Sequence, residues 1–130
     1  MGNLFHSYAI SASGMEAQAR RMRHVAENLA NADTPGYRRK TIDFRAETDR
    51  VTGMSHVATG PVQLDRRDLP RIYDPGHPMA DAQGYYQGST VDTIIEIADA
   101  REASRSYEAN LRIFDQTRQM AQGLLDLLRR

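Results

Sequence analysis

Residues 93–130 read TIIEIADAREASRSYEANLRIFDQTRQMAQGLLDLLRR and decide the fold, because they lack proline and repeat apolar side chains at helical spacing. The main series recurs every seven residues: Ala100, Tyr107, Phe114, Ala121 and Leu128, with Asn110 in a partly polar series beside it. Further apolar residues flank it on both sides: Ile97, Leu111, Leu125, Ile113, Met120 and Leu127. This stripe is wider than one helical partner requires. We therefore expect a long helix that contacts more than one neighbour.

Two signals place the start of this helix between Ser89 and Thr93. The run Thr93-Ile94-Ile95-Glu96 has the form of a capping box, in which the threonine and glutamate side chains bond backbone N–H groups of the first turn. Asp92 adds a negative charge at the positive end of the helix dipole. The expected C-terminal segment spans residues 91–130.

A second long helix is predicted within residues 1–34. Its apolar residues form two heptad series: Phe5, Ala12, Ala19 and Ala26, and Tyr8, Met15, Met22 and Leu29. The interleaved spacing of three and four residues is typical of a coiled-coil seam. Pro35 disfavours helical geometry at Thr34, and Thr34-Pro35-Gly36-Tyr37 fits a type II turn with glycine at the position of positive φ.

The middle of the chain, residues 35–90, is expected to be irregular or to contain short strands. All five prolines and six of the nine glycines lie between residues 35 and 88, and these residues interrupt helices. The predicted fold is therefore mainly α, with the two long terminal helices paired as a coiled-coil-like layer. The alternative is a small helical bundle whose middle segment folds back over the exposed apolar side.

Composition excludes several classes of protein and site. The 130 residues carry 17 basic and 17 acidic side chains, and this neutral balance argues against nucleic-acid binding. The absence of cysteine excludes disulfides and thiolate metal sites. The first nineteen residues contain no Lys or Arg, so the charged start of a secretory signal is missing, and no apolar run is long enough for a membrane span.

Charge is unevenly distributed along the chain. Residues 20–40 contain six basic and two acidic side chains, whereas residues 72–100 contain five acidic side chains and no Lys or Arg. Complementary patches on one chain suit head-to-tail contacts between copies, which build open filaments. The alternative is that the two patches meet within one molecule.

Candidate catalytic and metal sites are weak. Asp74, His77 and Asp81 have a spacing that suits a metal ion and a metal-dependent enzyme, but Asp-Pro-Gly is also a common turn sequence. There is no phosphate-binding glycine motif and no exposed nucleophile motif. We predict no catalytic, cofactor-binding or metal-binding residue, and a chain that is not an enzyme.

Three stretches resemble a known family. Residues 28–37, NLANADTPGY, resemble the N-terminal signature of the flagellar rod and hook proteins of bacteria. Residues 99–110, DAREASRSYEAN, resemble the C-terminal helix of proximal-rod subunits of the FlgC type, and residues 73–78, YDPGHP, resemble their stretch before that helix. The short Thr34-Pro35-Gly36 connection is also similar to the sister FlgB type, which remains an alternative.

The resemblance implies a structural subunit of the basal-body proximal rod. Such subunits leave the cell through the flagellar type III export apparatus without signal cleavage. They then assemble in the periplasm, with copies of themselves and other rod proteins, into a hollow helical shaft that transmits motor torque to the hook. No cofactor, nucleic acid or membrane span is implied. A stand-alone coiled-coil adaptor or an export chaperone is the competing hypothesis.

Two groups of residues carry the function in this interpretation. The family motif and turn comprise Asn28, Leu29, Ala30, Asn31, Asp33, Thr34, Pro35, Gly36 and Tyr37. The assembly residues on the terminal helices are Met15, Met22, Leu29, Tyr107, Asn110, Leu111, Phe114, Leu125 and Leu128. The first group is expected to direct the chain out of the N-terminal helix, and the second to pack helices against each other and against neighbouring subunits.

Overall fold

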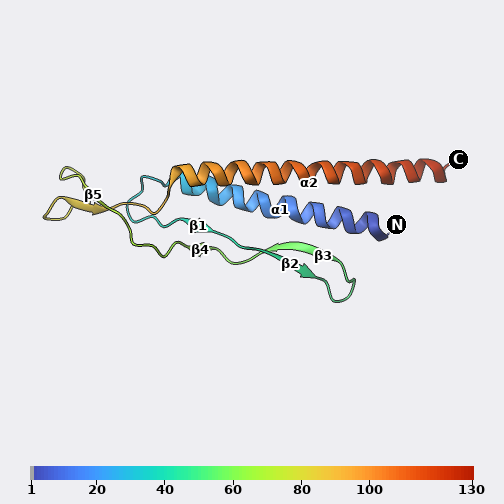
Figure 1. Cartoon of the computed structure of the whole chain (residues 1–130), viewed down its shortest axis with the longest axis horizontal. Helices are drawn as coiled ribbons and strands as arrows, with labels where there is room; N and C mark the ends of the chain where they lie inside the picture. The colour runs from blue at the N-terminus through green and yellow to red at the C-terminus, as the bar shows by residue number, and fades with distance from the viewer. Residues whose placement is uncertain (1) are drawn as a thin grey trace.

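The computed structural model describes residues 2–130 and contains two long helices joined by a strand-rich segment (Figure 1). Helix α1 spans Gly2–Ala30 and helix α2 spans Thr93–Leu128. The helices run antiparallel, and the C-terminal end of α2 extends beyond the N-terminal end of α1. Two long terminal helices are predicted from the sequence, and both are present. Met1, the first residue of the expected segment 1–34, lies outside the described residues.

The middle segment contains short strands, as the prolines and glycines predict. The six strands are β1 (Lys40–Thr41), β2 (Phe44–Thr48), β3 (Ser55–Thr59), β4 (Gln63–Leu64), β5 (Arg71–Tyr73) and β6 (Tyr85–Gln87). They form three antiparallel two-stranded ladders, β1–β4, β2–β3 and β5–β6. The first two ladders belong to one long hairpin, which pairs Lys40 with Leu64 at one end and Thr48 with Ser55 at the other.

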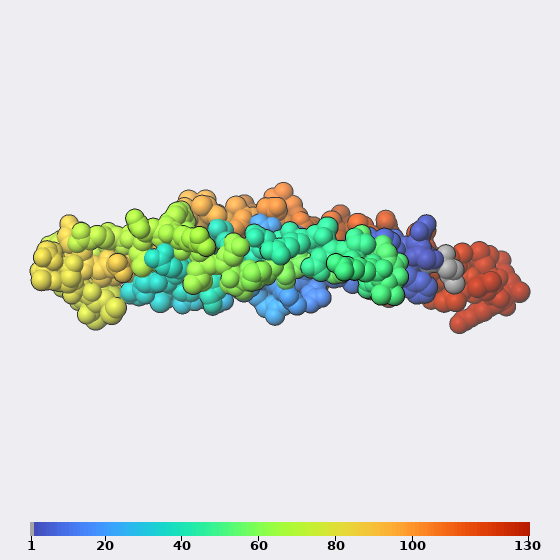
Figure 2. Space-filling view, turned by 90° about the horizontal axis from the view of Figure 1, so that it is seen from below, coloured from blue at the N-terminus to red at the C-terminus, as the bar shows by residue number. Residues whose placement is uncertain are grey.

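Helix α1 lies between α2 on one side and the long hairpin on the other (Figure 1). Strand β3 and, farther along, β1 pack on α1. Figure 2 shows the hairpin, in green, running lengthwise along an elongated molecule. The small-bundle alternative is therefore wrong about the middle segment, which covers α1 and leaves the outer side of α2 open.

The seam between the helices is built from small and polar residues. Its buried members are Ser11, Gly14, Val25 and Asn28 on α1, and Glu96, Ala103 and Thr117 on α2, whereas the buried Ala17 lies toward β3. Gly14 lies so close to Asn110 that a Cβ at position 14 would stand 2.8 Å from the Asn110 Nδ2, and the Asn110 side chain would have to shift. Tyr8 and Phe114 close the seam nearer the N-terminus, edge to face at 5.0 Å between ring centroids.

The predicted seam agrees with the packing of α2 and with one of its two series on α1, since Tyr8, Met15, Met22 and Leu29 are half-buried and Tyr8 packs on Phe114. On α2 the heptad members Ala100, Tyr107 and Phe114 are half-buried. On α1 the series that begins at Phe5 and Ala12 is largely exposed, and the stripe through Gly14 faces α2 instead. The physical reason is the close approach of the helices, which only small side chains permit.

The predicted capping box is also wrong. Helix α2 begins at Thr93, and its N-cap is Asp92, whose carboxylate accepts a hydrogen bond of 3.0 Å from the Ile94 N–H. Glu96 does not fold back onto the first turn, because its side chain is fully buried between α1 and β1. The sequence correctly predicts where the helix starts, but not the residue that caps it.

The molecule buries little apolar surface on its own. Among residues 2–130 the buried apolar side chains are Ala17, Val25 and Ala103. The accessible surface is 9203 Å², whereas a compact monomer of 14.7 kDa exposes roughly 6,900 Å². The excess arises from the elongated shape and from the uncovered face of α2.

Candidate functional site: an assembly face and its buried joint

Asn28 joins the end of α1 to β1 and α2. Its Nδ2 donates to the Lys40 carbonyl at 2.9 Å and to Glu96 Oε2 at 3.3 Å. Its Oδ1 accepts from the Lys40 N–H and from the Tyr37 hydroxyl, both at 2.9 Å. The buried amide thereby uses both donors and both acceptor positions, and one side chain fixes three segments.

A network of ion pairs surrounds this amide, and we call Asn28, Arg39 and Glu96 together the buried joint. Arg39 Nε donates to the buried carboxylate of Glu96, and its Nη2 donates to Asp99 Oδ2 at 2.6 Å. Arg21, on α1, donates to the other oxygen of Asp99 at 3.2 Å and reaches Glu102 at 3.4 Å. The basic segment 20–40 and the acidic segment 72–100 thus meet inside one molecule at these residues, which is the second of the two arrangements considered from the sequence.

The turn after α1 has the predicted geometry. Gly36 has φ of +76°, and the Tyr37 N–H donates to the Thr34 carbonyl at 3.2 Å. The Tyr37 carbonyl accepts from the Thr90 N–H at 3.0 Å, which links the turn to the residues before α2. Burial raises the pKa of the Tyr37 hydroxyl, so this group keeps the proton that it donates to Asn28.

The remaining motif residues lie around this turn. Asn31 Nδ2 donates to the Glu27 carbonyl at 2.9 Å, and its Oδ1 accepts from the Thr34 hydroxyl at 3.1 Å. Leu29 and Pro35 are half-buried, whereas Ala30 and Asp33 are exposed. Within the motif, the structure therefore concentrates the long-range contacts on Asn28 and the residues from Gly36 onward.

Gly36→Val is expected to lower the free energy of unfolding by about 1–3 kcal/mol, because a β-branched side chain resists positive φ. A Cβ at this position meets no atom within 4 Å, so the effect isolates the backbone conformation. Urea unfolding of the full chain measures it. Gly36→Asn is the matched control, since asparagine tolerates this region better; an equal loss in both variants, or none in Gly36→Val, contradicts the account.

Asp65, just beyond β4, is tied to Arg67. The Arg67 guanidinium donates to Asp65 Oδ2 at 2.6 and 2.9 Å, and the Arg67 N–H donates to Oδ1 at 3.0 Å. These bonds lower the pKa of the Asp65 carboxyl to about 2. The same arginine donates to the Thr90 carbonyl at 3.2 Å, so the pair anchors the hairpin to the start of α2.

Asp65→Asn is expected to remove part of the acid dependence of stability. Because the folded pKa of Asp65 is lowered, the ionised carboxylate stabilises the fold above the unfolded pKa of about 3.9. That contribution is lost as pH falls from about 4 to about 2. Urea unfolding between pH 6 and pH 2 should show wild type and variant converging in acid. Asp68→Asn, at an exposed carboxylate, is the control, and a pH-independent difference for Asp65→Asn contradicts the prediction.

The residues expected to mediate assembly divide into two sets. Met15, Met22, Leu29, Tyr107, Asn110 and Phe114 are half-buried, and Asn110 and Phe114 contact α1 directly. Leu111, Leu125 and Leu128 are instead 40%, 47% and 76% exposed. The second set therefore lies outside the packing within one molecule.

The two ends of the chain each match a known protein family. Residues 9–38 match the family described as "Flagella basal body rod protein", and residues 82–127 match "Flagellar basal body rod FlgEFG protein C-terminal". The flagellar basal-body rod protein FlgC of Agrobacterium fabrum is 46% identical over 127 residues, which cover 92% of this chain and 91% of that protein. The chain belongs to the flagellar basal-body rod family, FlgC type.

More distant FlgC proteins align over similar lengths. Those of Bacillus subtilis and Salmonella typhimurium are each 32% identical to this chain and cover 95% of it and 97% of their own length. In this FlgC-type chain, the matched residues 9–38 contain the motif 28–37, and the matched residues 82–127 contain the apolar stripe of α2 up to Leu127. Asn28 and Glu96, and the exposed apolar residues of α2 up to Leu127, thus lie within segments that match rod-protein families.

Helix α2 of this FlgC-type chain exposes many large apolar side chains, which lie on both flanks of the stripe that packs on α1 and at its C-terminal end. Its exposed large side chains are Ile94, Ile95, Ile97, Leu111, Ile113, Met120, Leu124, Leu125, Leu127 and Leu128. Figure 1 shows the C-terminal end of α2, in red, extending beyond α1. Exposed apolar side chains that gather into large patches mark interaction surfaces in proteins.

The group Asp74, His77 and Asp81 has a structural role in this FlgC-type chain. His77 stacks on Tyr86 at 3.8 Å between ring centroids and accepts a hydrogen bond from the Met79 N–H. Asp81 accepts from the Gln83 and Tyr85 N–H groups, which lower its pKa. Within residues 2–130, no three His, Asp or Glu side chains are grouped as metal ligands.

Sequence reasoning misses two residues of the buried joint, Arg39 and Glu96. The spacing of Glu96 predicts a helix cap, and Arg39 enters only as part of a basic segment. The available signal is the position of Glu96 between Ile95 and Ile97, because a charge within an apolar run is either exposed or paired. Its partner cannot be identified from sequence spacing, since Arg39 lies 57 residues away.

Proposed function

We propose that this chain is a structural subunit of the proximal rod, which assembles with copies of itself and other rod proteins into the hollow helical shaft that carries torque from motor to hook. One observation carries the proposal: the monomer exposes 9203 Å², well above the roughly 6,900 Å² of a compact protein of this mass. Much of the exposed apolar surface lies on the two flanks of α2 and at its C-terminal end. Neighbouring subunits provide the cover that the middle segment does not.

The terminal helices are proposed to form the coiled-coil-like layer of the shaft. Within one subunit, α1 and α2 pack through the seam at Gly14 and Ala103. Between subunits, the part of the α2 stripe that α1 leaves exposed packs through Leu111, Leu125 and Leu128, which are the exposed assembly residues. In this proposal, residues 1–34 and 91–130 form the layer, and residues 35–90 lie on its outer surface.

The joint at Asn28 is proposed to set the direction in which the hairpin leaves the helices. It binds the backbone of Lys40 and the side chains of Tyr37 and Glu96. Since these bonds are directional, the hairpin is held in one orientation along α1. A repeated orientation is what a regular helical assembly requires of each subunit.

The proposed location is the periplasmic rod of the basal body, reached through the flagellar type III export apparatus without signal cleavage. Family membership supports the basal body, and the route follows from the resemblance to exported rod subunits. Neither helix of residues 2–130 combines the length and apolar content needed to cross a membrane. The proposal includes no catalytic activity and no cofactor.

Deletion of the gene in its motile host, followed by complementation, tests the function. We expect deletion to abolish swimming and to leave basal bodies without a rod, and we expect the plasmid-borne chain to restore both and to be present in purified basal bodies. Imaging of basal bodies and immunoblotting give the readouts. Recovery of the chain only in the cytosol, with rods intact in the deletion strain, supports an adaptor or chaperone and contradicts the proposal.

A further inference from the structure

The strand edge that faces α1 is occupied by side chains of that helix. The Val57 N–H of β3 donates to the Ser13 hydroxyl at 2.9 Å, and the Ser55 N–H donates to His6 Nε2 at 3.4 Å. Farther along the hairpin, the Asn28 amide bonds both the N–H and the carbonyl of Lys40 in β1. Helix α1 therefore bonds three N–H groups and one carbonyl that the inner edge directs away from its partner strand.

The opposite edge of the hairpin has free backbone groups in β2. The Gly60 N–H donates to the Asp43 carbonyl and the Asp49 N–H donates to the Met54 carbonyl, both at 2.8 Å. Because antiparallel pairing alternates along a strand, Phe44, Ala46 and Thr48 direct their N–H and carbonyl groups outward. Among residues 2–130 their N–H groups have no acceptor, and every residue of β2 is exposed.

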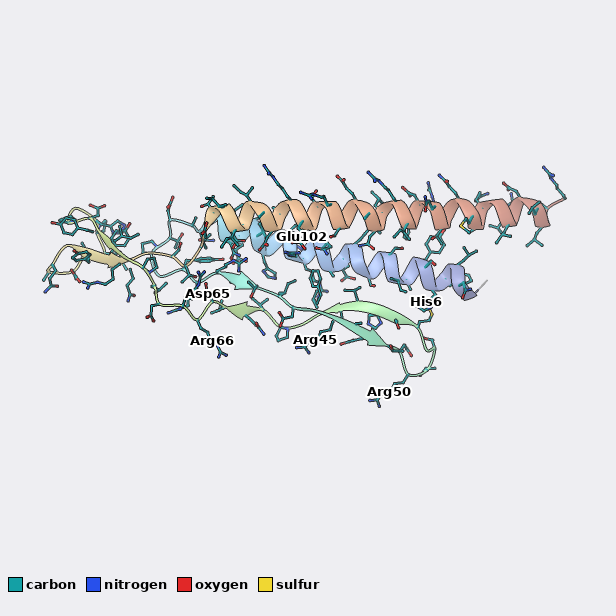
Figure 3. All side chains as sticks on the ribbon, in the orientation of Figure 1. His6, Arg45, Arg50, Asp65, Arg66 and Glu102 are labelled. Atoms are coloured by element: carbon teal, nitrogen blue, oxygen red, sulfur yellow. The ribbon has the colours of Figure 1, made fainter. Side chains whose placement is uncertain are left out.

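A second free stretch of the same edge lies at β4. The Asp65 N–H donates inward to the Arg39 carbonyl at 2.8 Å, so the adjacent Leu64 directs its backbone groups outward. Leu64 and Val62 also expose their side chains. Figure 3 shows Arg45 and Arg66, from the two stretches, projecting on the side away from the helices. An exposed edge of this kind is a template for strand pairing with another chain.

We propose that Phe44–Thr48 of one subunit pairs, edge to edge, with residues 62–66 of a second copy of this chain in the rod. The inference rests on the proposed function, because a rod needs contacts between two different surfaces that repeat without closing. Pairing of β2 with β2 is isologous and stops at a dimer. The inner edges are already bonded to α1, so β4 is the complementary edge that the long hairpin offers.

Side-chain chemistry is compatible with this pairing. Phe44 on one stretch and Val62 and Leu64 on the other are exposed apolar groups that a strand pair brings together. Each stretch carries one arginine and one carboxylate, Arg45 with Glu47 and Asp65 with Arg66, so neither has a net charge that repels the other. The arginines also discourage non-specific pairing of the free edge before assembly.

Cysteine cross-linking in assembled basal bodies tests the contact directly. The chain contains no cysteine, so Ala46→Cys and Leu64→Cys, combined in one chain, provide a clean pair for a short bismaleimide. We expect basal bodies to yield cross-linked dimers and larger cross-linked multimers of this chain. Their amount should be at least tenfold greater than with the control pair Val51→Cys and Leu64→Cys. Val51, at the tip of the hairpin, is fully exposed and lies outside the proposed pair.

The outcomes separate this inference from the proposed function. A chain that is incorporated into basal bodies without forming the 46–64 cross-link overturns the edge contact and leaves the rod function standing. A cross-link in single Ala46→Cys basal bodies, or one to a different protein, also overturns it, because the contact is then isologous or has another partner. Absence of the chain from basal bodies overturns both.

Proline substitutions supply a second measurement. Ala46→Pro removes an outward N–H that bonds nothing within the chain, whereas Glu47→Pro removes an N–H from the ladder with His56. Ala46→Pro should keep the unfolding midpoint of the isolated chain and reduce complete rods at least tenfold. Glu47→Pro should lower the midpoint itself. Normal rods with Ala46→Pro overturn the proposal.

Discussion

Leu111→Asp and Leu125→Asp are each expected to give a folded, soluble chain that does not enter the rod. Both leucines are exposed in the isolated subunit, at 40% and 47%, so a carboxylate there remains in water and changes the free energy of unfolding little. In the assembly the same carboxylate is desolvated without a partner, which costs several kcal/mol. A loss of about 3 kcal/mol weakens one contact more than a hundredfold, and the contact repeats in every subunit.

The measurements are circular dichroism of the purified variants and counting of rods in basal bodies from complemented strains. Gln119→Asp is the matched control, because position 119 is exposed and its neighbours one turn away, Asp115, Gln116, Gln122 and Gly123, are not apolar. The control should assemble. If the leucine variants unfold in solution, the stripe is an internal core; if they assemble normally, the assembly face is elsewhere on α2.

Asn28→Leu is expected to destabilise the isolated chain by about 3 kcal/mol. Leucine fills a similar volume but leaves the Lys40 N–H and carbonyl and the Tyr37 hydroxyl without the bonds that they now make. It also removes one of the donors to the buried Glu96 carboxylate. Each unsatisfied buried group costs about 1–3 kcal/mol. The total loss is smaller than the sum of these costs, because water reaches the half-buried Tyr37 hydroxyl and replaces its lost bond.

Urea unfolding at neutral pH checks this value, with Asn31→Leu as the control. Asn31 belongs to the same motif, but its side chain bonds only the Glu27 carbonyl and the Thr34 hydroxyl near the end of its own helix. The control should lose less than about 1 kcal/mol. Equal losses at positions 28 and 31 contradict a special role for the joint.

Features that depend on local spacing are predicted well from sequence. The apolar period and the missing proline indicate α2, α1 ends at Ala30 before Pro35, and Gly36 occupies positive φ as the type II turn requires. The stripe on α2 is also predicted correctly, because α2 presents a single regular series to α1. Each of these features follows from residues within one or two helical turns of each other.

Features that depend on distant partners are not predicted. The packed face of α1 is set by how closely Gly14 approaches Asn110, and the heptads of α1 alone do not contain that information. Glu96 has the right spacing for a cap, yet the Arg39 guanidinium provides a stronger partner across the fold. The strand pairs are short, and their register depends on side chains of α1 rather than on their own pattern.

The uneven distribution of bonding along the helix pair has a mechanical consequence. At the end that contains Asn28, Arg39 and Glu96, directional hydrogen bonds and ion pairs resist shear between α1 and α2. Toward Tyr8 and Phe114 the contact is mainly an aromatic edge, which is far less sensitive to small sliding. Under a twisting load the subunit is therefore stiff where the hairpin attaches and compliant at the opposite end, so elastic strain accumulates near the N-terminus of α1.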